Sequence, residues 1–206
     1  IELLIAQIKN EFSTIEPNLT IEIQELASPE KVMELNIQEN FIRAIYTSLN
    51  GVYRMSPTIS GLVETSNNIA KVTVQKGLIK VKCLIRSSSE SNKQDLTNSL
   101  KSAFELAGFE VKLSGEYPGW QPNVNSKILE IVSNIYEDLH GEKAHVAACH
   151  AGLECGILGQ NYPKMDMVSF GPTILGAHSP DEKVSISSTQ KFWRFLQEIL
   201  KNIPKK

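Results

Sequence analysis

His178 is the residue of this 206-residue sequence that is best suited to bind a metal ion. It lies within residues 171–182, a run of small and turn-forming residues that predicts a loop. A histidine on a loop can present a ring nitrogen outward, which is what a zinc ligand requires. The alternative, a loop histidine satisfied by solvent or by the backbone, stays open at this point.

A second group of interest is the run His-Ala-Gly-Leu-Glu-Cys-Gly at residues 150–156, which follows an apolar run at 144–148 that predicts a short buried strand. Gly152 would let a ligand approach the backbone closely, and a helix start after a strand is suited to binding a carboxylate. Cys149 and Cys155 could bind a metal ion together with His150, but the spacing of these residues fits no standard zinc site. We therefore favour two buried thiols.

Arg86 ends an apolar run that predicts a strand. An arginine in that place can present its planar fork of N–H groups to one carboxylate. Its alternative partners are the nearby acidic residues Glu90 and Asp95. The sequence alone does not choose between these two roles.

Composition excludes several classes of function. The net charge is −2 with both signs interspersed, so the basic stripe of a nucleic-acid-binding protein is absent. No apolar run approaches the roughly 20 residues of a membrane-spanning helix. Three cysteines without a C-x-x-C pair fit a reducing compartment, so we expect a cytoplasmic protein. The sequence also lacks H-x-D, H-E-x-x-H and G-x-S-x-G motifs and a phosphate-binding glycine loop, so it holds no complete catalytic centre.

The first part of the chain has the pattern of a two-layer α+β unit. Period-two alternation predicts strands, apolar residues at helical spacing predict helices, and Lys76-Gly77 predicts a hairpin turn. The expected elements are a strand at 19–23, a helix from Ser28 to Asn50, strands at 68–75 and 78–85, a helix at 89–106 and a strand at 109–113. This strand-helix-strand-strand-helix-strand order is typical of a ferredoxin-like fold.

Residues 114–122 are rich in turn formers and predict a linker, although an ordinary surface loop has the same composition. Beyond it we expect helices at 126–139 and 189–200, the second capped by Ser187 or Ser188, strands at 144–148 and 165–170, and an ambiguous element at 151–158. This α/β part is too thin to cover both faces of a sheet and looks like the edge of a larger domain. The helical pattern already under way at 1–8 fits a processed N-terminus or a chain cut from something longer.

Six short strings become specific when they are taken together. They are Met-Ser-Pro at 55–57, Gly-Leu-Val-Glu-Thr-Ser-Asn-Asn at 61–68, Arg-Ser-Ser at 86–88, the run at 150–156, Ser-Phe-Gly-Pro at 169–172 and Gly-Ala-His-Ser-Pro-Asp-Glu at 176–182. From about Asn50 to the end of the chain, these strings resemble, in order, the lid and C-terminal part of Xaa-His dipeptidases, the aminoacyl-histidine or carnosinase-like zinc enzymes.

The resemblance implies a hydrolase in which a lid is inserted into a catalytic domain that holds two zinc ions. Residues 1–113 would form the ferredoxin-like lid, and residues 114–206 would form the C-terminal α/β segment of the catalytic domain. A zinc-bound water, deprotonated near neutral pH, would attack the scissile carbonyl of a dipeptide. A homodimer formed through the lid is a possible assembly.

The same likeness implies roles for five residues. His178 would be the last zinc ligand, and Arg86 would grip the C-terminal carboxylate of the dipeptide. Gly152 would contact that end of the substrate through its backbone, while Glu154 and His150 would line the pocket.

The departures from the family pattern are equally informative. The family's H-x-D histidine, bridging aspartate, further acidic ligand and Glu-Glu pair have no counterpart here. One histidine cannot hold two ions, so we expect negligible hydrolysis and weak metal binding from this chain alone. Three interpretations remain: a fragment of a dipeptidase, a non-catalytic peptide- or carboxylate-binding module on the same scaffold, and a ferredoxin-like interaction domain with an α/β tail.

Overall fold

The computed structural model describes residues 1–149 and 153–203 and divides the chain into two compact units, Ile1–Leu35 and Asn36–Lys206. The first unit contains helix α1 (Glu2–Glu11), in agreement with the helical pattern at the start of the sequence. The strand expected at 19–23 is wrong, because these residues belong to no sheet.

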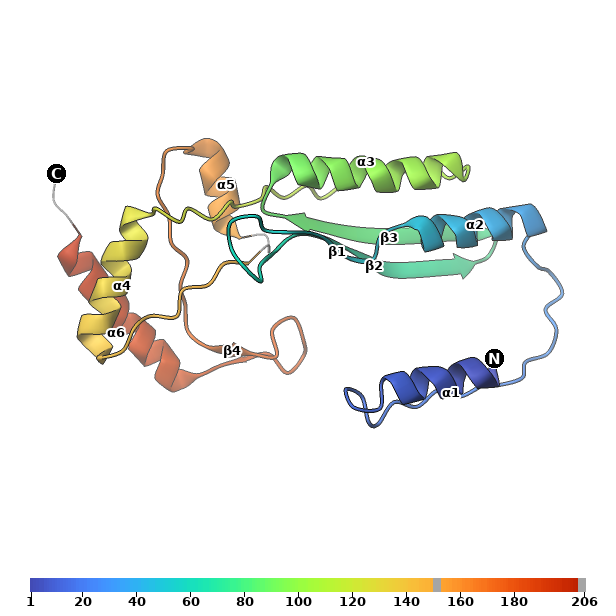
Figure 1. Ribbon diagram of the computed structural model, residues 1–206, viewed down its shortest axis with the longest axis horizontal. Coiled ribbons are helices and arrows are strands. Elements are labelled where there is room, and N and C mark those ends of the chain that lie inside the picture. The colour runs from blue at the N-terminus through green and yellow to red at the C-terminus, as the bar shows by residue number, and fades with distance from the viewer. Residues whose placement is uncertain (150–152, 204–206) are drawn as a thin grey trace. The chain divides into compact units, whose positions relative to one another are not determined.

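Helix α2 (Leu35–Thr47) starts at the boundary between the two units. Strands β1 (Gly51–Met55), β2 (Val63–Gln75) and β3 (Leu78–Ser87) follow it, and helix α3 (Glu90–Leu106) comes next. The three strands form an antiparallel sheet in the order β1-β2-β3. Helix α3 packs along β3 and buries Leu96, Leu100 and Phe104 (Figure 1). These elements place the end of β3 directly before the start of α3.

The hairpin between β2 and β3 confirms the turn that the sequence predicts. Gln75 pairs with Leu78, and both turn residues have positive φ, 51° at Lys76 and 74° at Gly77. Positive φ at both central residues defines the type I′ turn, whose twist suits a two-residue hairpin.

The ferredoxin-like strand order is not confirmed. Residues 109–113 form no strand, and β1, which the sequence analysis did not anticipate, is the third member of the sheet. Phe109 and Val111 are nonetheless half-buried while Glu110 and Lys112 are exposed. Alternation in the sequence therefore reports which side chains face the protein, whereas a strand also needs a hydrogen-bonded neighbour.

The C-terminal part contains helices α4 (Lys127–His140), α5 (Glu154–Asn161) and α6 (Ile186–Asn202) and a small hairpin of β4 (Ile174–Leu175) and β5 (Lys183–Val184). Helices α4 and α6 lie side by side around a core of Val132, Phe195 and Ile199 (Figure 1). This arrangement confirms the two longer helices that the apolar spacing predicts.

Three local expectations in this part need correction. The runs at 144–148 and 165–170 are not strands, because no neighbouring segment pairs with them among the described residues. Most of the first run is also exposed rather than buried. The cap of α6 is Ser185, whose hydroxyl accepts the N–H of Ser188, and not Ser187 or Ser188.

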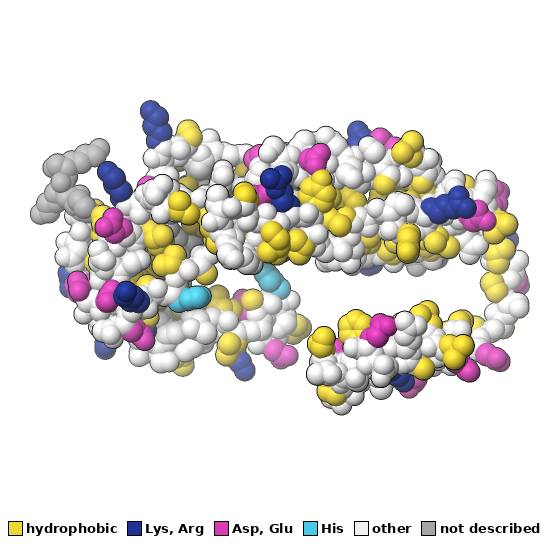
Figure 2. Space-filling view, viewed as in Figure 1, with side chains coloured by type: hydrophobic (Ala, Val, Ile, Leu, Met, Phe, Trp, Pro, Cys, Tyr) yellow, Lys and Arg dark blue, Asp and Glu magenta, His cyan; other side chains and the backbone are white. Residues whose placement is uncertain are grey.

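Charged groups of both signs are scattered over the surface, and Figure 2 shows no continuous basic stripe on the face it presents. In the ranges that the structure describes, no helix is long and apolar enough to cross a membrane.

Candidate functional site

Arg86 lies at the end of β3, where it pairs with Ser66 of β2, and its side chain is exposed. The two acidic residues that were its alternative partners both bind other groups. Glu90 binds the ammonium group of Lys93 at 2.6 Å, and Asp95 accepts the Tyr53 hydroxyl at 2.5 Å. Within residues 1–149 and 153–203, no ion pair to Arg86 is found, so its guanidinium is available for a carboxylate from outside the chain.

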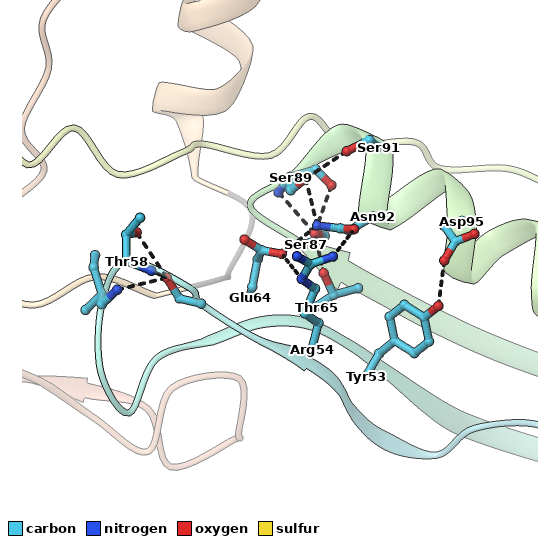
Figure 3. A network of polar contacts seen from close by, with 12 residues as sticks. Tyr53, Arg54, Thr58, Glu64, Thr65, Ser87, Ser89, Ser91, Asn92 and Asp95 are labelled. Atoms are coloured by element: carbon cyan, nitrogen blue, oxygen red, sulfur yellow. Dashed lines mark hydrogen bonds and ion pairs between the residues drawn. The ribbon is translucent and has the colours of Figure 1, made fainter.

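A cluster of polar side chains, which we call the strand-end network, holds the segment that follows Arg86 (Figure 3). At its centre the buried carboxylate of Glu64, 9% exposed, accepts the amide of Asn92 at 2.6 Å and lies 3.5 Å from Nε of Arg54. Arg54 in turn donates to Oδ1 of Asn92 at 3.1 Å. These three residues tie β1 and β2 to the first turn of α3.

The remaining members of the strand-end network are Thr65 and Ser87, whose buried hydroxyl groups lie 2.7 Å apart. Ser87 also donates to the carbonyl of Ser89, and the Ser88 N–H donates to the carbonyl of Glu64. These buried hydrogen bonds fix the position of the strand end next to Arg86.

A groove of about 900 Å³ runs along β3 between α3 and residues 109–118, and Arg86 lies at one end of its lining. Of the predicted site residues that the structure describes, neither Glu154 nor His178 lines this groove. The groove therefore does not bring Arg86, Glu154 and His178 together in one site.

His178 lies on the loop between β4 and β5, residues 176–182, which we call the His178 loop. Its backbone has φ of 64°, a left-handed conformation that non-glycine residues rarely adopt. The loop is held by its own groups: the His178 N–H donates to Glu182, and the Ser179 hydroxyl donates to the carbonyl of Gly176 at 2.7 Å. The imidazole is exposed, and residues with a strained backbone concentrate at functional sites.

Glu154 is the first residue of α5 and is exposed. Its surroundings include Tyr117, whose pKa is raised by partial burial and by the negative charge of Glu154. The carboxylate is thus next to the segment at 114–122. The other two predicted pocket residues, His150 and Gly152, lie outside the described residues.

The described residues contain no group of three or more histidine, cysteine, aspartate or glutamate side chains that could hold a metal ion. Catalytic zinc is usually held by three protein ligands, so these residues cannot by themselves hold a zinc pair. His178 fits the role of a single ligand, because its ring is exposed on a preformed loop.

The cysteines have no disulfide partner in the described part of the chain. Partial burial raises the pKa of the Cys83 and Cys155 thiols and so favours their protonated form, although Cys83 still exposes part of its surface. The expectation of two buried thiols is wrong for Cys149, which is exposed, and Cys155 is only half-buried.

Sequence reasoning missed the role of Glu64. The signal that could have revealed it is the pairing of β1 with β2, which sets Arg54 opposite Thr65 and therefore next to Glu64. Because β1 was not anticipated as a strand, its arginine could not be matched with that acid.

Comparison with known proteins gives consistent matches. The chain is 41% identical over 199 residues to the cytosol non-specific dipeptidase of Escherichia coli (strain K12), covering 97% of this chain and 41% of that protein. A crystal structure of aminoacylhistidine dipeptidase from Vibrio alginolyticus matches it with a TM-score of 0.84 at 41% identity, covering 100% of this chain and 42% of that one. The chain thus spans about two fifths of the length of these relatives.

The model of "Peptidase family M20/M25/M40", a family of typically metal-dependent peptidases, matches residues 5–202. That range takes in almost the whole chain, including β3 with Arg86, the segment at 150–156 and the His178 loop. The chain belongs to the M20/M25/M40 peptidase family.

Proposed function

We propose that the polypeptide to which this chain belongs, the parent polypeptide, is a zinc-dependent dipeptidase that hydrolyses Xaa-His dipeptides. Family membership supports peptide hydrolysis, and the name of the Vibrio alginolyticus relative supports histidine at the second position. The observation that carries the proposal is Arg86, an exposed guanidinium without an ion-pair partner among the described residues, at a strand end fixed by buried hydrogen bonds.

In this proposal residues 1–113 belong to the lid and residues 114–206 to the catalytic domain. We assign His178 as one ligand of a zinc pair, whose remaining ligands come from outside this chain. Glu154 would line the substrate pocket with His150, and the backbone of Gly152 would contact the substrate. Among the described residues β3 is an edge strand of the sheet, and the half-buried Phe109 and Val111 line the groove along it, which supports a ferredoxin-like lid.

Arg86 would bind the C-terminal carboxylate of the substrate with both arms of its guanidinium. Anchoring one end of the substrate sets the distance from that end to the scissile bond, so short peptides are favoured over long ones. A bound zinc pair would supply an activated water and polarise the scissile carbonyl.

We further propose that this chain alone is inactive, because most of the metal ligands are missing from its sequence. A cytoplasmic location is supported by the name of the Escherichia coli relative, and assembly into a dimer through the lid stays a proposal.

A second candidate function is a non-catalytic module that binds peptides or carboxylates. The observation that favours it is the absence of an H-x-D motif and a Glu-Glu pair from the 206 residues. In that case Arg86 would still bind a carboxylate, and no bond would be broken.

Hydrolysis assays on the parent polypeptide test the proposal. We expect turnover of an Xaa-His dipeptide, loss of turnover after chelation and recovery on adding zinc. An Xaa-Ala dipeptide measures the preference for histidine, and the 206-residue chain assayed in parallel should show no turnover. Turnover that survives complete removal of metal would refute the proposal, and peptide binding without turnover would favour the second function.

A further inference from the structure

Three backbone segments meet at the end of β3 at distances that leave no space for a side chain. A Cβ on Gly119 would lie 2.5 Å from the carbonyl oxygen of Ser87 and 2.9 Å from the carbonyl carbon of Ser88. A Cβ on Gly156 would collide with the carbonyl oxygen of Pro118. Residues 118–119 are therefore packed between the strand end and helix α5, and we call this arrangement the glycine stack.

Polar contacts hold the segment before Gly119 on the first turn of α3. The Gly119 N–H donates to Glu90 at 2.7 Å, and the ammonium group of Lys93 binds the other oxygen of Glu90 at 2.6 Å. Lys93 also donates to the carbonyl of Tyr117 at 3.0 Å, and its side chain is only 14% exposed. Residues 117–119 are thus fastened to α3 rather than free, which distinguishes them from a flexible linker.

The other side of the glycine stack carries the start of α5. Gly156 lies two residues after Glu154 in the first turn of this helix and is buried. Tyr117 is close enough to Glu154 for the negative charge of that carboxylate to act on the phenol. One short segment therefore contacts both elements that carry described candidates for substrate binding, β3 with Arg86 and α5 with Glu154.

We propose that Gly119 and Gly156 are positioning residues, which hold the strand end with Arg86 and the helix start with Glu154 at one fixed separation. The effect of this fixed separation on substrate binding rests on the proposed function. A methyl group at Gly156 must push α5 away from residues 118–119, because the atom that it meets is backbone and cannot rotate aside. The two elements then move apart while each keeps its own fold.

The test compares Gly156→Ala with Gly159→Ala in the parent polypeptide. Gly159 lies in the same helix, and a Cβ there would meet only the flexible end of Met167 at 3.5 Å, an ordinary contact. Two readouts are needed: KM and kcat for an Xaa-His dipeptide, and the distance between spin labels at Lys82 and Gln160 after the native cysteines are replaced by serine. Both label sites are exposed.

We expect Gly156→Ala to raise KM about tenfold to hundredfold with a smaller effect on kcat, because misplacement by about 1 Å has effects of this size. In Gly156→Ala, the mean distance between the two spin labels should change, or the distribution of distances should become broader. Gly159→Ala should leave KM within about twofold of the original value and the label distance unchanged.

Lys93→Met provides a second variant in case Gly156→Ala does not fold. It keeps most of the side-chain length, removes the contacts to Glu90 and Tyr117, and should change KM and the label distance in the same direction by a smaller amount.

Equal KM values and equal label distances in Gly156→Ala and Gly159→Ala would overturn the inference. If the parent polypeptide hydrolyses no dipeptide, the proposed function fails, and the label distance alone tests the inference. A label distance that changes in Gly156→Ala but not in Gly159→Ala then supports the inference, and an unchanged distance in Gly156→Ala overturns it.

Discussion

The strand-end network and the His178 loop both present a candidate functional side chain, but they are held in different ways. In the strand-end network, Arg54 and Glu64 each bind Asn92, which is 38 and 28 residues away in sequence. In the His178 loop, the hydrogen bonds of Gly176, His178, Ser179, Asp181 and Glu182 join groups within the loop, and these residues are exposed.

This difference shows where each side chain gets its fixed position. The strand end depends on three strands and a helix being folded together, so damage to the strand-end network should lower global stability. The His178 loop depends on one hairpin and a strained backbone, so changes there should affect ligand binding with little effect on the fold.

The largest effect on stability is expected for Glu64→Ala. The change leaves the Asn92 amide and the Arg54 guanidinium without their buried acceptor. Because Arg54 is half exposed and partly screened by water, we expect a loss of about 2–3 kcal/mol in the free energy of unfolding. Urea unfolding of the 206-residue chain measures it. The matched control is Glu39→Ala, which breaks an exposed pair with Arg43 and should cost at most about 0.5 kcal/mol. Equal losses in the two variants would show that the strand-end network does not hold the fold.

The second largest effect on stability is expected in the His178 loop. His178→Gly removes the imidazole but relieves the left-handed backbone, so we expect a gain of up to about 1 kcal/mol in the free energy of unfolding. His178→Ala also removes the imidazole but keeps the backbone strain, and should show no such gain. Thermal unfolding compares the two variants, and zinc titration of the parent polypeptide should show weaker binding in both. Equal stability of the Gly and Ala variants would mean that the loop stores no strain.

The smallest effect concerns the pH dependence of the contact between α3 and residues 117–119. Burial alone would raise the pKa of Glu90, but the hydrogen bonds from Lys93 and the Gly119 N–H outweigh it and lower that pKa. A lowered pKa in the folded state contributes stability above the ordinary pKa of a glutamate, and this contribution is lost as the pH falls through the lowered value.

Because Glu90 is about half exposed, the contribution should amount to a few tenths of a kcal/mol. The measurement is the difference in unfolding free energy between the original chain and Glu90→Gln, taken from neutral to acidic pH. We expect this difference to shrink as the pH falls from the ordinary pKa of a glutamate through the lowered pKa of Glu90. A difference that stays constant with pH would show that the carboxylate charge contributes nothing.

Local signals predicted much of the fold. Helices α3 and α4 and the turn at 76–77 follow from helical apolar spacing, a serine cap and turn residues, all of which act within a few positions. The runs at 19–23, 109–113, 144–148 and 165–170 were expected to be strands and are not. Pairing depends on a second segment that the alternation pattern does not contain, which also explains why β1 was missed.

The candidate site was predictable only in part, for the same reason. The sequence could name Arg86 but could not decide between a substrate and the acids nearby. That choice depends on Tyr53 engaging Asp95 and on Gly119 and Lys93 engaging Glu90. The Tyr53–Asp95 and Gly119–Glu90 contacts join residues far apart in sequence, whereas Lys93 and Glu90 meet within the first turn of α3.

The most direct test of the account asks whether Arg86 recognises the carboxylate of a dipeptide. The kcat/KM is measured for an Xaa-His dipeptide and for the same dipeptide with a C-terminal amide. The proteins compared are the original parent polypeptide, its Arg86→Ala variant and its Arg43→Ala variant. Arg43 serves as the control because it is an exposed arginine of α2. We expect the original protein and Arg43→Ala to prefer the free carboxylate by at least about thirtyfold, since a bound charge pair contributes about 2 kcal/mol or more. Arg86→Ala should lose nearly all of this preference. An Arg86→Ala protein that keeps the full preference for the carboxylate would contradict the account.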